Sequence, residues 1–267
     1  MKKVLIIGKR GFIGKNLNKF LKLEYKVKLI SFKNALNFNQ INKYNFVINT
    51  SISKDYITKK YNKNFDNDVK IADKINNKKT VYIFLSSRKV YKTKPNINEN
   101  GKLAPKSNYS KNKLKTEKLL YKKFKKNLIV LRISNIIGNK LKFTKNLHKT
   151  FVDIFYDKAK KGIIYDNKKN YKDFLSIQKF CEIVKMIIRK NLRGTFNVSI
   201  GKKVYLNDLV KWLNHFNTRK FKIIKFNEIA SGNFYLNNRK LMSKIKINND
   251  LEILKKDSLD LSKRLFR

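Results

Sequence analysis

The chain has 267 residues, and its 42% hydrophobic content is enough for the core of one large domain, with or without a smaller lobe. The apolar run before Gly8 is too short for a signal peptide, and no later run is long enough to span a membrane. We therefore expect a soluble, cytoplasmic protein that does not bind membranes. A single cysteine, Cys181, excludes an internal disulfide, and with only two histidines beside it no metal site is predicted.

The formal net charge of +47 makes a polyanion such as nucleic acid a candidate partner. Of the 65 basic residues, however, 56 are lysines spread along the whole length. The chain is also rich in Asn, Ile, Phe and Tyr, which AT-rich codons specify together with lysine. Biased base composition therefore explains the charge better than a nucleic-acid partner does, and nucleic acid remains the less favoured alternative. The charge still favours anionic ligands by electrostatic steering.

Apolar runs alternate with helical spacing along the first half of the chain. Strands are predicted at 2–8, 25–31, 45–51, 80–87 and 128–134, and helices at 12–23, 62–76 and 108–124. Such alternation implies βαβ crossovers and an open parallel sheet with helices on both faces. The predicted fold class is α/β, a Rossmann-type doubly wound parallel sheet.

The pattern loosens past residue 138. Helices are predicted at 143–162, 177–191 and 205–216, and a strand at 194–201. We expect residues 1–138 to form the dinucleotide-binding sheet domain, completed by parts of 174–200. Residues 139–267 would mainly form a smaller, interleaved, substrate-binding lobe.

Three glycines, Gly8, Gly11 and Gly14, lie between the first predicted strand and the helix that follows it. In this position Gly8 would allow a tight turn, Gly11 would let the backbone approach a pyrophosphate, and Gly14 would let the helix pack closely on the sheet. The loop thus predicts a dinucleotide site, although three such glycines also suit any strand-to-helix turn. Further cofactor-binding candidates are Phe12 and Ile13 beside the loop and Thr50 at the end of the third strand.

The end of the second predicted strand bears on the choice of cofactor. NAD-specific sites usually carry an acidic residue there, whereas this chain has Ser31, Phe32 and Lys33. Arg10 in the loop and Lys33 could instead pair with a 2′-phosphate. NADP is therefore favoured over NAD, with Ser31 as a further cofactor-binding candidate. The alternative is that both cations are ordinary members of a lysine-rich surface.

Tyr109 and Lys113 are four residues apart on a predicted helix and therefore share one face. An ammonium near a phenol favours the phenolate, which makes Tyr109 a candidate general acid or base for a carbonyl/alcohol pair. Ser87 ends the fourth predicted strand, at the edge where doubly wound sheets bind ligands. Its hydroxyl could hydrogen-bond the same substrate oxygen.

The order of these motifs resembles the extended short-chain dehydrogenase/reductases, in particular the NAD(P)-dependent epimerase/dehydratase family that acts on nucleotide sugars. "GKRGFIG" matches the family's glycine motif, "SSRKVY" aligns Ser87 with its catalytic Ser/Thr, and Tyr109 and Lys113 match its catalytic pair. "LRISNIIG", "KDFLSIQKFCEIV" and "GTFNVSIGKKVYLNDLV" resemble later segments of the family. The loop arginine is also similar to that of the GDP-fucose synthases, which use NADP.

The resemblance implies hydride transfer at a sugar carbon of a nucleotide diphosphate sugar. Tyr109 would give or take the hydroxyl proton, Lys113 would hold the nicotinamide ribose, and Ser87 would bind the substrate oxygen. Arg88 and Lys89 stand where 4,6-dehydratases carry an acidic pair, so an epimerase or a ketoreductase is expected rather than a dehydratase. Homodimers are common in the family, so the resemblance leaves a homodimer open, and no residue of the sequence itself indicates one.

Two alternatives remain open at this point. One is a family member without catalysis that binds RNA or another polyanion. The other is a protein that binds the cofactor as a sensor or as a subunit of an assembly. Arg132, which sits at a strand end, is expected to be structural rather than substrate-binding.

Overall fold

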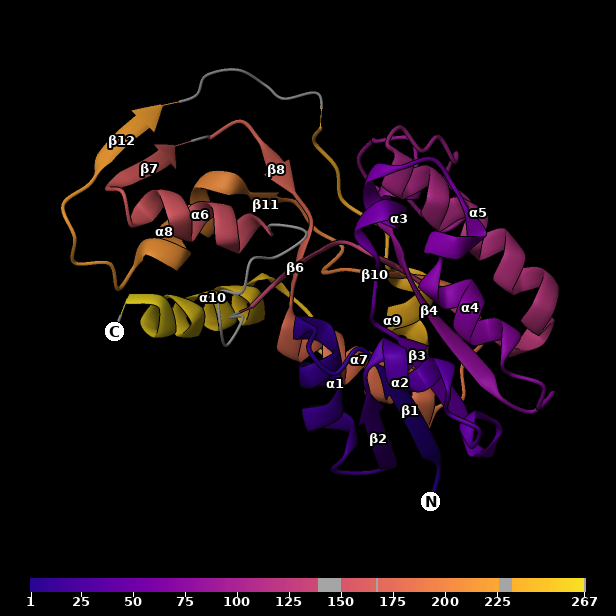
Figure 1. Ribbon diagram of the computed structural model, residues 1–267. Helices are drawn as coiled ribbons and strands as arrows, with labels where there is room; N and C mark the ends of the chain where they lie inside the picture. Colours follow the sequence, from indigo (N-terminus) through magenta and orange to yellow (C-terminus); the bar gives the residue numbers. More distant parts are fainter. Residues whose placement is uncertain (139–149, 167, 226–231, 267) are drawn as a thin grey trace. The chain divides into compact units, whose positions relative to one another are not determined.

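The computed structural model describes residues 1–138, 150–166, 168–225 and 232–266 (Figure 1). The chain forms two compact units. The sheet unit comprises 1–92, 101–133 and 181–197, and the second unit comprises the described residues of 93–100, 134–180 and 198–267. Among the helices that the structure describes, none is both long and apolar enough to cross a membrane.

A six-stranded sheet with the order β10-β5-β4-β3-β1-β2 forms the centre of the sheet unit. All pairings from β2 through β1, β3 and β4 to β5 are parallel. This confirms the predicted doubly wound fold class. The strands are β1 (Lys3–Ile7), β2 (Lys26–Ile30), β3 (Phe46–Asn49), β4 (Val81–Ser87), β5 (Leu128–Ile133) and β10 (Gly194–Val198).

Helices connect these strands, and α4 and α5 lie on one face, beside β3 and β4 (Figure 1). The apolar side chains on that face, among them Leu5, Ile7, Tyr82 and Phe84, form one core cluster with residues of α2, α4 and α5. The helices are α1 (Phe12–Leu21), α2 (Phe32–Leu36), α3 (Lys54–Thr58), α4 (Asn67–Asp73), α5 (Asn108–Phe124) and α7 (Ile177–Arg189), with short 3₁₀ turns η1 (Ile41–Lys43), η2 (Lys63–Phe65), η3 (Arg88–Val90) and η4 (Lys125–Asn127).

The strand order changes direction at β1, because β2 lies on one side of it and β3 on the other. In register, Ile7 pairs with Ile30 on one side and with Asn49 on the other. The residues that follow these three strands therefore emerge at one edge of the sheet. In open α/β sheets a ligand crevice forms at this point, outside the carboxyl ends of the strands.

In its described residues, the second unit has three strand pairs and four helices, and three of these helices contribute to a core of its own. β6 pairs with β9 and β7 with β12 in parallel, whereas β8 and β11 are antiparallel. The elements are β6 (Asn135–Ile137), α6 (Phe151–Ala159), β7 (Ile163–Asp166), β8 (Tyr171–Lys172), β9 (Phe174–Ser176), β11 (Val204–Tyr205), α8 (Leu206–Asn214), β12 (Lys222–Lys225), α9 (Arg239–Ile245) and α10 (Leu251–Phe266).

The predicted element boundaries hold best where the apolar pattern is long. The helix predicted at 108–124 has these bounds in α5, whereas the one predicted at 62–76 is shorter. It begins only after Asp66, whose carboxylate accepts hydrogen bonds from two backbone N–H groups of the first turn. Of the helix predicted at 143–162, residues 143–149 lie outside the described residues, and the described part is α6.

Candidate functional site

The glycine loop is closed by contacts that leave no room for side chains at two positions. Gly8 has φ +121°, and a Cβ built there would lie 2.2 Å from Thr50 Oγ1. A Cβ on Gly14 would lie 2.6 Å from the Gly8 carbonyl oxygen. The start of α1 can therefore approach the end of β1 as closely as it does only because both residues are glycine.

Thr50 fastens this loop from the neighbouring strand. Its backbone N–H and its hydroxyl both donate to the Ile7 carbonyl oxygen, at 2.7 and 2.8 Å. Thr50 was predicted to bind the cofactor, but its hydroxyl proton is donated to Ile7 and is therefore not available to a ligand. Thr50 shapes the loop and holds the ends of β1 and β3 together.

The N-terminus of α1 opens directly from the loop. The Gly11 N–H donates to the Gly8 carbonyl at 2.9 Å, and Gly11, as the N-cap residue, has no side chain with which to cap the helix. The backbone N–H groups of Phe12, Ile13 and Gly14 form the first turn, where the helix dipole favours an anion. Together with the close-packed glycines, this uncapped end is a backbone cradle that fits a pyrophosphate.

The end of β2 lies against the same loop. The N–H groups of Gly8 and Lys9 both donate to the Ile30 carbonyl, at 2.8 and 3.1 Å. The next residue, Ser31, caps α2 by accepting the Asn34 N–H at 3.2 Å, so its hydroxyl proton can still be donated. Arg10 and Lys33 are exposed cations on either side of this junction.

The predicted catalytic residues come from β4 and the helix that packs on it. Ser87 ends β4 and accepts the Lys89 N–H at 3.2 Å, which leaves its hydroxyl free to donate to a ligand. Tyr109 is half-buried in the first turn of α5, and Lys113 is buried one turn later. The Lys113 ammonium lies 6.0 Å from the centroid of the Tyr109 ring. This distance places Tyr109 and Lys113 side by side, and Lys113 is hydrogen-bonded to the Leu85 carbonyl of β4.

Two oxygens hold the Lys113 ammonium. It donates to the Leu85 carbonyl at 2.9 Å and lies 4.0 Å from a carboxylate oxygen of Asp68 on α4. It also lies over the Phe84 ring, 4.6 Å from the centroid. The lysine side chain is therefore fixed from the sheet, from α4 and from an aromatic face.

Sequence reasoning missed Asp68. The carboxyl group is buried and accepts a hydrogen bond from the Tyr82 hydroxyl at 2.9 Å. Burial raises the pKa of Asp68 to about 6, against the opposing effect of the Lys113 charge. The available signal was weak: two aspartates, Asp66 and Asp68, in a chain with only 18 acidic residues.

A second ammonium flanks Tyr109. Lys89 follows Ser87 in the turn η3, and its Nζ lies 5.8 Å from the Tyr109 ring centroid. Burial lowers the pKa of Lys89, and the charge of the neighbouring Arg88 acts in the same direction. The group beside Tyr109 at this position is therefore the amine of Lys89, where a 4,6-dehydratase would carry a carboxyl group.

Arg132 is engaged inside the sheet unit, in keeping with the structural role expected from its place in the chain. Its guanidinium donates to both carboxylate oxygens of Glu117, at 3.1 and 2.7 Å, and to the Tyr91 hydroxyl at 3.0 Å. Ser86 also donates to Glu117. The arginine thus fastens β5 to α5.

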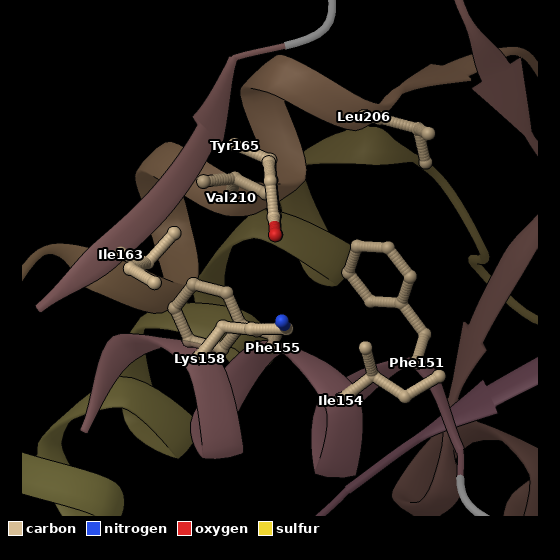
Figure 2. Close-up of a pocket in the computed structure, with 8 residues that line it drawn as sticks. All are labelled: Phe151, Ile154, Phe155, Lys158, Ile163, Tyr165, Leu206 and Val210. Carbon is tan, nitrogen blue, oxygen red and sulfur yellow. The ribbon is translucent and has the colours of Figure 1, made fainter. Parts of the chain in front are cut away.

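The second unit contains a cavity of about 230 Å³ that is lined mainly by apolar side chains. Figure 2 shows the Lys158 amine and the Tyr165 hydroxyl turned toward its middle, between the rings of Phe151 and Phe155. The Lys158 Nζ lies 5.7 Å from the Tyr165 ring centroid. The cavity combines apolar walls with one cation. Within the described residues, no group of three or more His, Cys, Asp or Glu side chains could hold a metal ion.

Comparison with known proteins adds to this geometry. A family model described as the NAD dependent epimerase/dehydratase family matches residues 43–199. No curated protein sequence matches the chain.

Several solved structures share the fold at low sequence identity. The UDP-Glc/GlcNAc 4-epimerase from Campylobacter jejuni is 17% identical with a TM-score of 0.78, covering 99% of this chain and 100% of that one. The UDP-N-acetylglucosamine 4-epimerase from Methanobrevibacter ruminantium M1, in complex with UDP-N-acetylmuramic acid, is 19% identical with a TM-score of 0.77, covering 98% and 97%. RMD from Pseudomonas aeruginosa, complexed with NADPH, is 14% identical with a TM-score of 0.77, covering 99% and 97%.

Proposed function

The chain belongs to the NAD dependent epimerase/dehydratase family, and from that premise we propose that it is an NADP-dependent epimerase or ketoreductase of a nucleotide diphosphate sugar. The observation that carries the proposal is the arrangement at one sheet edge. A backbone cradle between β1 and α1 lies at the same carboxyl edge as Ser87, and Lys113, one turn after Tyr109 on α5, donates to the Leu85 carbonyl of β4. Family membership alone would be equally compatible with a non-catalytic protein, whereas the residues at this sheet edge support an enzyme.

The glycine loop would hold the pyrophosphate through backbone N–H groups of Phe12, Ile13 and Gly14. When bound, the nicotinamide supplies or accepts the hydride. Lys113 would donate to the nicotinamide ribose with an N–H that the hydrogen bond to Leu85 does not use. The ammonium would also stabilise negative charge on Tyr109.

Tyr109 would exchange a proton with the sugar oxygen at the reacting carbon. In reduction of a ketone its hydroxyl gives the proton, and in oxidation of an alcohol its phenolate takes it. Ser87, whose oxygen already accepts the Lys89 N–H, would donate its own proton to the same sugar oxygen. The serine thereby orients the substrate, and the tyrosine carries the proton.

The preference for NADP rests on Arg10 and Lys33. Both are exposed beside the end of β2, where this chain has no carboxylate to bind a ribose diol. A guanidinium can bind a 2′-phosphate through two hydrogen bonds, and the Ser31 hydroxyl can add a third. Since a carboxylate is missing and two cations are present, the 2′-phosphate of NADPH fits this junction better than the free hydroxyl of NADH.

Elimination of water is disfavoured by the turn η3. A 4,6-dehydratase needs a carboxyl group to protonate the leaving hydroxyl, and Arg88 and Lys89 occupy the positions after Ser87. Lys89 instead adds positive charge beside Tyr109. This arrangement supports proton and hydride exchange at one carbon, as in reduction or epimerisation.

The test is a titration of the purified protein with NADPH and with NADH, followed by nicotinamide fluorescence. We expect tighter binding of NADPH, and an Arg10→Ala variant should lose about tenfold or more in NADPH affinity while NADH binding changes little, because the guanidinium contacts only the 2′-phosphate. Lys9→Ala, one residue away and also exposed, is the matched control. Equal losses for both cofactors would refute the role of Arg10, and absence of binding would refute the proposed function.

A further inference from the structure

We propose that Asp68 is a positioning residue of the reaction, which holds the Lys113 ammonium in the one orientation that reaches both the cofactor ribose and Tyr109. The inference rests on the proposed function, because it assigns Asp68 a role through Lys113. Neither the glycine motif nor the Tyr-x-x-x-Lys spacing contains this residue. It lies 45 positions before the lysine in the chain, on a different helix.

Asp68 is held by a hydrogen bond from the neighbouring strand β4. One carboxylate oxygen accepts the Tyr82 hydroxyl at 2.9 Å, and the side chain of Asn49 at the end of β3 acts on the same carboxyl group by lowering its pKa. The other oxygen faces the Lys113 ammonium at 4.0 Å. The hydrogen bond to Tyr82 ties the carboxylate to β4, which opposes its movement together with the lysine.

The two helices that carry this pair are held in register by a second buried carboxylate. Asp66 caps α4 by accepting the N–H groups of Asp68 and Val69 with one oxygen, at 3.0 and 3.1 Å. Its other oxygen accepts the hydroxyl of Thr116 on α5 at 2.5 Å. Thr116 is three residues after Lys113, on the same face of α5. The Asp66 contact therefore sets the position of Asp68 relative to Lys113.

The lysine has three N–H donors, and one of them donates to the Leu85 carbonyl at 2.9 Å. The Asp68 oxygen at 4.0 Å lies beyond hydrogen-bond distance and attracts the ammonium by its charge. Donors that Leu85 does not occupy are available to a ligand. Without the negative charge of Asp68, the ammonium would keep the hydrogen bond to Leu85 and the contact with the Phe84 ring, but no anion would draw it toward α4.

Stability alone does not account for the pair. The side chains of Lys113 and Asp68 are each 7% exposed, so both charges lose most of their hydration. For such a buried pair, the attraction between the two charges usually does no more than offset the free energy lost when both are removed from water. Apolar residues of similar size often stabilise a fold more. Burial also raises the pKa of Asp68, so that keeping it ionised at neutral pH opposes folding. An ionised carboxylate at this place is best explained by what it does for Lys113.

The test is a double-mutant cycle with cofactor affinity as the readout. Asp68→Asn, Lys113→Met and the double variant are titrated with NADPH, or with NADH if the wild type prefers it. We expect Asp68→Asn to weaken binding about tenfold in the wild-type background and to have no effect beyond about twofold in the Lys113→Met background. Asp73→Asn, an exposed aspartate at the end of the same helix, should bind as the wild type does.

A second variant, Asp68→Glu, keeps the proposal testable if Lys113→Met does not fold. If Lys113→Met does not give a cooperative thermal transition, Asp68→Glu is compared with Asp68→Asn, and the retained charge should recover most of the affinity. Equal losses in both lysine backgrounds, unchanged or tighter binding by Asp68→Asn, or no recovery by Asp68→Glu would overturn the positioning role. A wild-type chain that binds neither cofactor would instead refute the proposed function, and the inference with it.

Discussion

Tyr109 shows how a single side chain takes its role from its surroundings. Thirteen tyrosines are present in the chain, but Tyr109 has one ammonium 6.0 Å from its ring centroid and another at 5.8 Å. Two positive charges at this range attract negative charge that develops on a reacting oxygen. Tyr121, elsewhere on α5, is exposed, and no ammonium of the described residues lies over its ring.

We therefore expect Tyr109→Phe to lower turnover by about 100-fold or more, the contribution of a general acid or base, and to leave NADPH affinity nearly unchanged. The phenylalanine keeps the ring in place and removes only the hydroxyl that exchanges the proton. Turnover is measured as oxidation of NADPH with a panel of nucleotide sugars, and Tyr121→Phe is the control. Turnover near the wild-type rate would remove Tyr109 from the mechanism.

Asp68 also predicts a pH dependence. Its pKa of about 6 in the folded protein lies above the ordinary value of 3.8, so the native state binds more protons than the unfolded chain between about pH 4 and 6. The free energy of unfolding of the wild type, relative to Asp68→Asn, should therefore fall as the pH rises through that window, by at most about 3 kcal/mol. Urea unfolding of both proteins at several pH values measures the difference. The neighbouring charged groups, Lys113 and Asp66, are present in both. A difference that stays flat or grows with pH would contradict the prediction.

At the scale of elements, Asp173 is a buried carboxylate that joins segments of the second unit by hydrogen bonds, as Asp66 joins α4 and α5. It is fully buried between β8 and β9, and its two oxygens accept the N–H groups of Ile200 and Leu236, at 3.1 and 2.9 Å. One carboxylate thus joins three chain segments that are far apart in sequence. An amide at this position would turn an N–H₂ group toward one of these donors.

Asp173→Asn should therefore lower the free energy of unfolding by about 1 to 3 kcal/mol, the cost of a buried donor left without an acceptor. Chemical denaturation followed by circular dichroism measures the change. Asp260→Asn, which alters an exposed aspartate of the same unit, should cost less than about 0.5 kcal/mol. If the two variants are equally stable, Asp173 does not hold these segments together.

On the scale of the whole molecule, the net charge of +47 affects every anion that approaches it. Because the lysines are spread along the chain, we expect only non-specific RNA binding, weaker than about 1 µM near physiological salt. Fluorescence anisotropy of a labelled single-stranded RNA across a salt series measures this. Tight RNA binding by a protein that turns over no nucleotide sugar would favour the polyanion-binding alternative.

Local features were predictable from the sequence. The alternation of strands and helices, the glycine loop and the spacing of Tyr109 and Lys113 each depend on residues that are neighbours in the chain. Short elements were not predictable in this way. The five-residue helices α2 and α3 are capped by Ser31 and Ser53 and have too few residues for a periodic pattern. The long helix α10 was also missed, although sixteen residues are enough to show one.

By itself, the sequence determined the fold class, the β1–loop–α1 unit and the predicted identity of Ser87, Tyr109 and Lys113, because strand and helix periodicity and turn chemistry act over a few residues. Only the tertiary structure decided which buried charges meet. Asp68 meets Lys113, Glu117 meets Arg132, and Thr50 closes on Gly8 because parallel strand register and helix packing bring together residues that no local pattern connects. A buried charge must find its partner in three dimensions, since the cost of burying it is offset only there.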